Sequence, residues 1–355
     1  IAAGGGSVLE IRDGRLSVGP HSAGADPGPA CYGRGGPATL TDIQVALGRL
    51  RPDFLPRAFG AQHDQPADPL ASVNRLQVLA GGPGRDIDEL AGAFLDVGVE
   101  TMANAIRHVS SGQGLDPADF TLFAFGGAAG QHACRVADAC GIRRVLTHPL
   151  SSVLSAVGIG IADWLQTRRA SLGAALDSAG LRVARQRLDL LESEARAALA
   201  QQGLATAPTK VERVLEIRVG DSEVAIDVSA QGEPAAVREQ FRQAFHARFG
   251  HLPPAAPLRI DALRVAVRAA QPLSPLAAAA RSAGAPAMSL PQTARAWFSG
   301  WAEVPVLAAD EVPIASNIMG PALVVEPHST LVLEPGWQLR RLDGGALLAE
   351  RLVAP

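Results

Sequence analysis

Two adjacent glycines at the end of an apolar segment are the most chemically informative feature of this 355-residue chain. Residues 120–125 predict a buried strand, Gly126 and Gly127 interrupt it, and residues 129–140 continue as a helix. A helix that starts after such a turn presents unpaired N–H groups, which together with the helix dipole suit a phosphate or another anion. The turn is neither a Walker phosphate loop nor the Gly-x-Gly-x-x-Gly dinucleotide motif. Spacing alone therefore leaves two interpretations open, a ligand-binding turn and a tight turn with no ligand.

Two side chains near such turns are candidates for chemistry. His132 lies one turn into the predicted helix, where an imidazole can contact a ligand or titrate near neutral pH. A partly buried structural histidine is the alternative. Asp26 lies in a loop rich in glycine and proline, where a carboxylate can hold a divalent cation through water or orient a nucleophile. Its alternative is an aspartate that accepts hydrogen bonds from its own loop, so both residues are candidate catalytic residues with these alternatives open.

A second glycine-rich segment lies near the start of the chain and consists of Gly4, Gly5, Gly6 and Ser7. Its small residues allow close approach of a phosphate, and its alternative is a tight turn at a strand edge. Cys31 stands next to the only tyrosine, and both a reactive thiol and the commoner small buried thiol are open interpretations. The other histidines lack metal-ligand spacing, so the sequence predicts no metal cluster.

Rigid elements must position these residues, and the first half of the chain predicts both strands and helices. Residues 120–125, 129–140 and 143–148 predict a β-α-β unit and therefore a parallel sheet. Asp13-Gly14 is typical of a hairpin turn. We interpret Thr41-Asp42 as the cap of a short helix, and Asp42 as a capping rather than a catalytic residue. The hairpin strands cover residues 7–11 and 15–18, and the helices of this half cover residues 43–50, 68–80, 86–111 and 154–170.

The second half of the chain changes in character near residue 170. Alternating apolar residues and the turn at Gly220-Asp221 predict a further hairpin. Residues 271–289 are rich in Pro, Ala and Ser and predict a linker or a long surface loop. Short strands and turns are expected from there to residue 355. The predicted strands before the linker cover residues 211–219, 223–228 and 258–267, and the predicted helices cover residues 181–202 and 234–249.

Composition narrows the class of protein. The chain is 47% hydrophobic and 19% charged, which is typical of a globular protein with an ample core. A net charge of -3 with scattered arginines gives no indication of nucleic-acid or membrane-surface binding. No apolar run reaches the roughly 20 residues that span a bilayer. The three cysteines have no zinc-type spacing and predict reduced thiols, which favours a cytoplasmic protein.

Several segments resemble one known family and keep its order along the chain. Residues 125–134 resemble the adenosine-contacting segment of the hydantoinase A/oxoprolinase family, and residues 21–36 resemble its most distinctive signature. Within the family, Ala129-Gly130-Gln131-His132 is more similar to the 5-oxoprolinase branch than to the hydantoinase branch. The other segments that carry the resemblance are residues 2–7, 151–163, 245–250, 320–326 and 335–337.

The resemblance implies a fold and a division into domains. It implies an α/β fold in which residues 1–168 form the second lobe of an actin-like (ASKHA) ATPase, the C-terminal part of the catalytic domain. An α+β C-terminal domain, similar to acetophenone carboxylase, would follow over residues 169–355 and end in a β-rich part. The family's Asp-x-Gly-Gly-Thr phosphate loop is absent and the chain begins at Ile1. We therefore expect the C-terminal portion of a longer protein, with a missing N-terminal half.

The resemblance also implies a chemistry. In this family ATP with Mg²⁺ phosphorylates the oxygen of a cyclic amide, which water then attacks; 5-oxo-L-proline would become L-glutamate, a step of glutathione metabolism. Further implied partners are a hydantoinase B-type subunit or domain and other copies in an oligomer. Alternatives are an N-methylhydantoinase, an acetone or acetophenone carboxylase subunit, and a non-catalytic assembly module. The implied nucleotide contacts are Gly4, Gly5, Gly6, Ser7, Gly126, Gly127 and Ala128.

Overall fold

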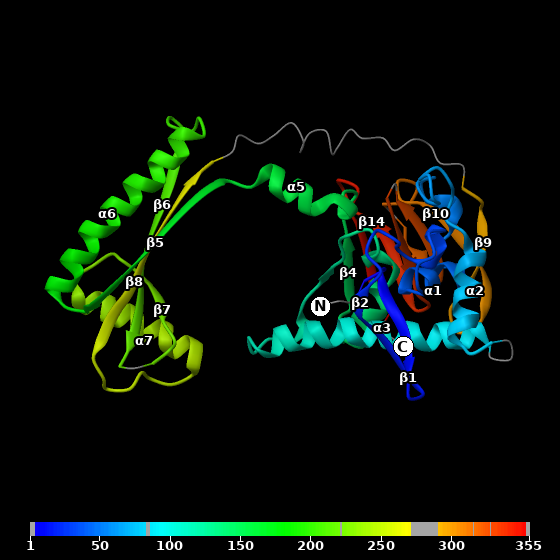
Figure 1. The fold of residues 1–355 in the computed structure, drawn as a ribbon, viewed down its shortest axis with the longest axis horizontal. Helices are drawn as coiled ribbons and strands as arrows, with labels where there is room; N and C mark the ends of the chain where they lie inside the picture. The colour runs from blue at the N-terminus through cyan, green and yellow to red at the C-terminus, as the bar shows by residue number, and fades with distance from the viewer. Residues whose placement is uncertain are drawn as a thin grey trace. The chain divides into compact units, whose positions relative to one another are not determined.

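The computed structural model describes residues 4–82, 86–220, 222–270, 290–314, 316–326 and 328–352. The chain divides into two compact units, one made of residues 1–157 and 278–355 and the other of residues 158–277. The expected C-terminal domain over residues 169–355 differs from this division. Its β-rich end (orange to red in Figure 1) belongs to the first unit, because β15 (Leu347–Arg351) pairs with β4 (Arg144–Thr147). The predicted linker at 271–289 lies outside the described residues.

The first unit begins with the predicted hairpin. β1 (Ser7–Arg12) pairs with β2 (Arg15–Ser22) around Asp13 and Gly14, whose φ angles of 50° and 75° lie in the left-handed region that such a turn requires. The hairpin packs through β2 on α3 (Ile87–Ser111), the long helix labelled in Figure 1. This prediction from the dipeptide Asp-Gly is confirmed.

The helices of the first unit begin at polar caps. Asp68 caps α2 (Pro69–Leu79) and Asp86 caps α3, at the residues where the predicted helices begin. α1 covers Leu40–Ala46 rather than residues 43–50, because Thr39 is its N-cap. Asp42 occupies the third helical position and completes a capping box with Thr39, so it is a cap residue in a different register from the one predicted.

The predicted β-α-β unit is present in shortened form. β3 (Leu122–Phe123) runs parallel to β4, as predicted, but covers two residues only. The helix predicted over residues 129–140 begins as a 3₁₀ turn at Ala129–Gln131 and continues as α4 (Ala133–Ala139). The sheet has the strand order β11-β14-β15-β4-β3. Three of its strands, β11 (Ile318–Met319), β14 (Trp337–Arg341) and β15, come from the C-terminal part of the chain.

Strands from the end of the chain complete the first unit. They supply part of a hydrophobic core in which Trp337, Leu333 and Val324 pack with Val145 and Ala133. A second sheet has the order β13-β12-β10-β9. The bounds of these strands are β9 Thr293–Trp297, β10 Trp301–Ala308, β11 Ile318–Met319, β12 Ala322–Glu326, β13 Ser329–Leu333 and β14 Trp337–Arg341.

The helix predicted over residues 154–170 is wrong in its second half. α5 covers only Leu154–Ile161, and β5 (Trp164–Ala175) follows. β5 pairs antiparallel with β8 (Leu258–Ala269) along most of its length. These cross-strand hydrogen bonds come from residues about ninety positions away, and they outweigh the local helical pattern.

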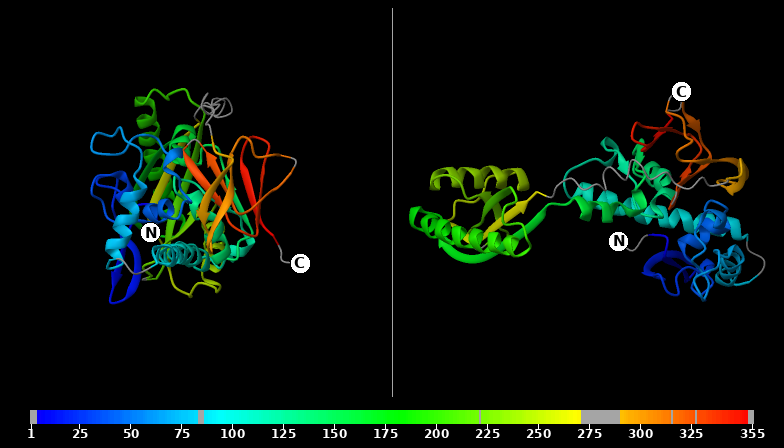
Figure 2. Two further views of the ribbon diagram at one scale, coloured as in Figure 1. Left: turned by 90° about the vertical axis from the view of Figure 1, so that its right-hand side faces the viewer. Right: turned by 90° about the horizontal axis from the view of Figure 1, so that it is seen from above.

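The second unit is an antiparallel sheet with two helices. The strand order is β5-β8-β6-β7, with β6 at Thr209–Val219 and β7 at Ile226–Ser229. The helices α6 (Ser178–Gln201) and α7 (Pro234–Phe249) lie beside this sheet (green to yellow-green in Figure 2). They share one hydrophobic core with it. The two units together make a mixed α/β protein, as predicted. Among the described helices, none combines the length and the apolar character that a membrane crossing requires.

Candidate functional site

The structure brings the two glycine-rich turns of the first unit together. A Cβ atom built on Gly5 would lie 2.7 Å from Thr41 Oγ1 and 3.4 Å from the Cβ of Ala128. Any side chain at residue 5 would therefore clash with the start of α1 and touch the turn at residues 126–128. Glycine allows this approach without displacing the Thr41 side chain. Two of the predicted contact segments thus form one continuous surface.

The first turn is held by its carbonyl groups. Ser7 closes it, because its N–H donates to Gly4 O and its hydroxyl accepts from Gly4 N, both at 2.9 Å. Thr41 N donates to Gly5 O at 2.9 Å, and Ala23 N donates to Gly6 O at 2.8 Å. The N–H groups of Gly5 and Gly6 meet no acceptor within the described residues. The hydrogen bonds to its carbonyl groups therefore hold the turn in place, and the N–H groups of Gly5 and Gly6 remain available to a ligand.

The second turn uses one of its donors internally. Gly126 has a φ of 97°, which favours glycine, and its N–H donates to Ser151 O at 2.7 Å. The N–H groups of Gly127 and Ala128 have no acceptor in the part of the chain that the structure describes. A Cβ on Gly127 would meet only His328 O, at 3.7 Å. The donors that remain for a ligand are thus those of residues 127 and 128, and not that of Gly126.

Asp26 lies exposed in the loop that follows Ala23. Its carboxylate makes no hydrogen bond or ion pair with other described residues, so the interpretation that it accepts bonds from its own loop is wrong. Because Ala23 N donates a hydrogen bond to Gly6 O, the loop begins next to the first glycine turn. A free carboxylate at this place is available to solvent, a cation or a substrate.

A buried carboxylate holds the same loop from below. Asp42 accepts from the N–H groups of Ala30 and Cys31 at 3.0 and 2.8 Å, and from Ser72 Oγ at 2.7 Å. It also accepts from Thr39 N at 2.9 Å. Its role therefore exceeds that of a helix cap, since it joins the signature segment to α1 and α2.

The thiol of Cys31 is inert in this environment. Burial, and then the charge of Asp42, raise the pKa of Cys31 far above its ordinary value. A neutral thiol with no exposed surface cannot act as a nucleophile. The buried-thiol interpretation is the one that fits the structure.

His132 lies at the start of α4, just after the second glycine turn, and only 3% of its surface is exposed. Its Nδ1 lies 3.2 Å from Gln44 Nε2, an amide donor, which leaves the proton on Nε2. Burial, and then the positive charges of Arg49 and Arg135, lower the pKa of His132 to about 3. His132 is therefore neutral at neutral pH, and the expectation that it titrates there is wrong. Its Nε2 has no partner among the described residues.

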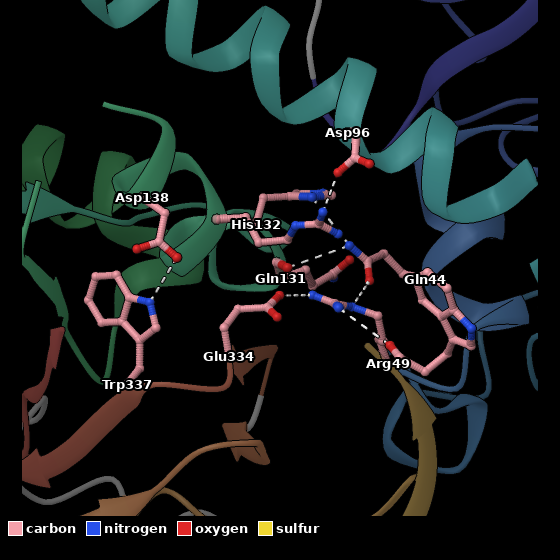
Figure 3. A network of polar contacts seen from close by, with 10 residues as sticks. Gln44, Arg49, Asp96, Gln131, His132, Asp138, Glu334 and Trp337 are labelled. Atoms are coloured by element: carbon pink, nitrogen blue, oxygen red, sulfur yellow. Dashed lines mark hydrogen bonds and ion pairs between the residues drawn. The ribbon is translucent and has the colours of Figure 1, made fainter. Parts of the chain in front are cut away.

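Arg49 is the centre of the polar network around His132, and the sequence contains no pattern that indicates it (Figure 3). Its guanidinium is fully buried, forms an ion pair with Glu334 and donates from Nε to Gln44 Oε1 at 3.0 Å. It also lies 5.0 Å from the centre of the Phe298 ring. Because Gln44 contacts His132, the network links α1 to the start of α4 and to the loop after β13.

A cavity of about 490 Å³ lies beside these elements, between α3, β3 and α4. Its lining is apolar except for Ser110 and His132, and it includes the exposed rings of Phe123 and Phe125. The unpartnered Nε2 of His132 belongs to a side chain that lines this cavity. The cavity is large enough for a ring-sized ligand.

The described residues fit an anion better than a metal ion. On two turns that lie close together, four N–H groups have no acceptor among the described residues, which suits phosphate oxygens. In contrast, no group of three or more His, Cys, Asp or Glu side chains that could hold a metal ion occurs in the described ranges. Asp26 alone does not make a Mg²⁺ site.

Two glycine turns that lie close together on a mixed α/β frame, with backbone donors that have no acceptor among the described residues, make a candidate site for a phosphate group or a nucleotide. Residues 1–168 match the family model described as hydantoinase/oxoprolinase. The chain belongs to this family, as its sequence motifs predicted.

Individual relatives agree with this assignment. A 5-oxoprolinase of Pestalotiopsis fici is 34% identical over 371 residues, which cover 99% of this chain and 28% of that protein. The caprolactamase subunit alpha of Pseudomonas jessenii is 32% identical over 96% of this chain and 50% of its own length. The crystal structure of the ATP-dependent caprolactamase from that organism aligns with a TM-score of 0.72, over 98% of this chain and 52% of its own, at 29% identity.

A nucleotide-free acetone carboxylase structure shares the fold alone, with a TM-score of 0.74 at 17% identity. The alignment covers 99% of this chain and 52% of the acetone carboxylase chain. The chain thus spans between about a quarter and a half of the length of these relatives.

Proposed function

We propose that this chain is the nucleotide-binding portion of an ATP-dependent cyclic-amide hydrolase, of the type that converts 5-oxo-L-proline to L-glutamate. The observation that carries the proposal is the proximity of Gly5 and Ala128, which brings together two turns whose N–H donors have no acceptor among the described residues. Family membership supports the reaction class, because relatives are named 5-oxoprolinase and ATP-dependent caprolactamase. Both names denote enzymes that open a cyclic amide.

The chain's own residues would hold the nucleotide rather than perform the hydrolysis alone. The N–H groups of Gly127 and Ala128 would donate to one part of ATP, and those of Gly5 and Gly6 to another. When bound, ATP would supply a phosphoryl group to the lactam oxygen, which activates the carbonyl carbon for attack by water and allows the ring C–N bond to break. Asp26 would orient the substrate or a water molecule from its exposed loop, which begins at the first turn. His132 would stay neutral, and because its Nε2 is buried it would contact a ligand only after the surrounding side chains move.

Several components of the proposed enzyme would come from outside the described residues. Mg²⁺ would need ligands from outside the described residues, as would the first phosphate loop of an actin-like ATPase. The proposed partners are an N-terminal half and a hydantoinase B-type subunit or domain, in an oligomeric cytoplasmic enzyme. The relatives' greater length supports this view. The isolated chain would then have no complete oxoprolinase activity.

Acetone carboxylation is the second candidate function, and the shared fold with acetone carboxylase is the observation that favours it. A hydantoinase activity remains an alternative of the same chemical class as the first. Substrate trials with 5-oxoproline, hydantoins and ketones, on the chain assembled with its partner parts, would separate these activities. A non-catalytic assembly module would bind no nucleotide.

Thermal melting with and without Mg-ATP tests the proposal directly. We expect Mg-ATP to raise the melting temperature of the chain, because a ligand that binds only the folded state stabilises it. Gly127→Val should abolish this rise because it fills the space beside the Gly127 and Ala128 donors, and it should leave the protein folded, since a Cβ there would meet only His328 O, at 3.7 Å. Gly300→Val is the matched control, because a Cβ there meets no atom within 4 Å.

Two outcomes count against the proposal. Absence of any nucleotide-dependent rise in a cooperatively folded wild-type chain would favour the assembly module. An equal rise in wild type and Gly127→Val would place the nucleotide elsewhere on the chain.

A further inference from the structure

A buried carboxylate near the second glycine turn has no role in the proposed function. Glu326, at the end of β12, is 5% exposed and accepts hydrogen bonds from three hydroxyl groups. Thr147 Oγ1 donates to it at 3.4 Å, Ser151 Oγ at 3.2 Å, and Ser329 Oγ also donates to it. Within the described residues it forms no ion pair. Burying a carboxylate whose donors are all hydroxyl groups costs folding free energy, which indicates that Glu326 has a role other than stability.

Ser151 connects this carboxylate to the turn. Its hydroxyl donates to Glu326, and its carbonyl oxygen accepts from Gly126 N at 2.7 Å. Ser151 is thereby fixed from two sides. A shift of its hydroxyl would move the carbonyl that holds the first residue of the turn.

The strand next to Glu326 supports the rest of the turn. A Cβ on Gly130 would lie 2.8 Å from Thr330 O and 3.2 Å from Leu331 Cα, so β13 packs directly on this backbone. His328, the residue just before β13, lies near the middle of the turn, because a Cβ built on Gly127 would be 3.7 Å from its carbonyl oxygen. The residues around Glu326 therefore lie against the turn at Gly126 and Gly127 and against the backbone just after it at Gly130.

We propose that Glu326 is a positioning residue for the turn at Gly126–Ala128, acting through Ser151. This rests on the proposed function only in its consequence for ATP. The C-terminal strands would thus set the geometry of a ligand-binding turn made nearly two hundred residues earlier in the chain. Removal of the carboxylate should loosen the Gly126–Ser151 hydrogen bond first and the core of the unit much less.

Amide hydrogen exchange at Gly126 tests the positioning without any ligand. In Glu326→Ala the Ser151 hydroxyl loses its hydrogen bond to a charged group, and the Ser151 carbonyl then holds Gly126 less firmly. We therefore expect the Gly126 N–H to exchange at least about tenfold faster. Exchange of the Val324 and Leu331 amides in β12 and β13 should change much less. Glu326→Gln keeps one acceptor oxygen and should restore part of the protection. Glu303→Ala, an exposed carboxylate on β10, is the control.

Ser151→Ala removes the hydroxyl but keeps the carbonyl, and it serves if Glu326→Ala fails to fold. It should accelerate exchange at Gly126 in the same direction. Unchanged exchange at Gly126 in the folded variants, or an equal acceleration at all three amides, would overturn the proposal. The second outcome would mean a merely structural role.

The dissociation constant for Mg-ATP gives the functional consequence. We expect Glu326→Ala to raise it about tenfold or more and Glu326→Gln to raise it less. Wild-type affinity in Glu326→Ala, with a wild type that does bind, would contradict the positioning role. A wild type without affinity for Mg-ATP would defeat the proposed function alone, since hydrogen exchange still decides the role of Glu326.

Discussion

His132 shows how surroundings decide what a candidate residue can do. A histidine beside a glycine turn suggests acid–base chemistry, but this one is buried next to Arg49 and Arg135, which disfavour its protonation. Asp42 shows the opposite case, since a residue interpreted as a simple cap holds several backbone and hydroxyl donors. Asp26 alone among these carries the exposed, unpartnered carboxylate that a substrate could reach.

The burial of His132 predicts a pH dependence of stability. Its pKa is about 3 when folded and 6.5 as an ordinary value, so the unfolded chain binds the proton more readily. The stability that neutral His132 contributes is fully present above about pH 6.5 and is lost as the pH falls toward 3. Lowering the pH from 6.5 to 5 should cost about 2 kcal/mol of unfolding free energy from this group.

Urea unfolding of wild type and His132→Asn at several pH values measures this contribution. The asparagine keeps an acceptor near Gln44 and removes the titration, so its stability should fall less between pH 6.5 and 5. His108→Asn, on the exposed side of α3, is the control and should follow wild type. Parallel curves for wild type and His132→Asn would show that His132 is protonated normally in the folded protein.

At the scale of elements, short segments depend on longer partners. β3 has only two residues, yet the adjoining turn is held by Ser151 and by the backbone of β13. The predicted helix over residues 154–170 loses its second half to β5 because β8 offers a long antiparallel partner. Pairing across the sheet thus decides element type wherever the local preference is weak.

The close packing of β13 on the glycine turn predicts a difference between two neighbouring glycines. Gly130→Ala places a methyl group 2.8 Å from Thr330 O, a backbone atom that cannot rotate away. We expect a loss of about 1–3 kcal/mol in unfolding free energy, the usual cost of overpacking. Gly127→Ala has 3.7 Å of room and should be nearly neutral. Denaturant unfolding of both variants checks this, and equal stabilities would mean that β13 does not press on the turn.

At the scale of the whole molecule, chain order and structural unit do not coincide. The first unit is made from both ends of the sequence, because β15 pairs with β4 and Trp337 packs in the same core as Val145. The second unit has a hydrophobic core of its own, built from α6, α7 and their sheet. Each unit therefore has separate requirements for folding.

This division predicts the behaviour of two fragments. Residues 158–277 expressed alone should unfold cooperatively on heating, because their core is self-contained. Residues 1–157 alone should not, because they lack the strands that complete their sheet. Circular dichroism melting of both fragments checks this, with the full chain as control. A cooperative transition in residues 1–157 alone would contradict the role assigned to the C-terminal strands.

The local features of this protein were determined by its sequence. The hairpin at Asp13-Gly14, the helix starts at Asp68 and Asp86 and the glycine turn at residue 126 each depend on a few neighbouring residues with strong backbone preferences. The family was recognisable for the same reason, since its motifs are short and keep their order.

The tertiary structure alone decided how these pieces act together. Only the folded chain places Gly5 against Ala128, occupies the Gly126 N–H with Ser151, and buries His132 beside two arginines. Glu326 ends a segment that carries the family resemblance, yet nothing in that segment indicates a contact with Ser151. Each of these contacts joins residues distant in sequence, and their formation depends on packing and burial, which no local pattern encodes.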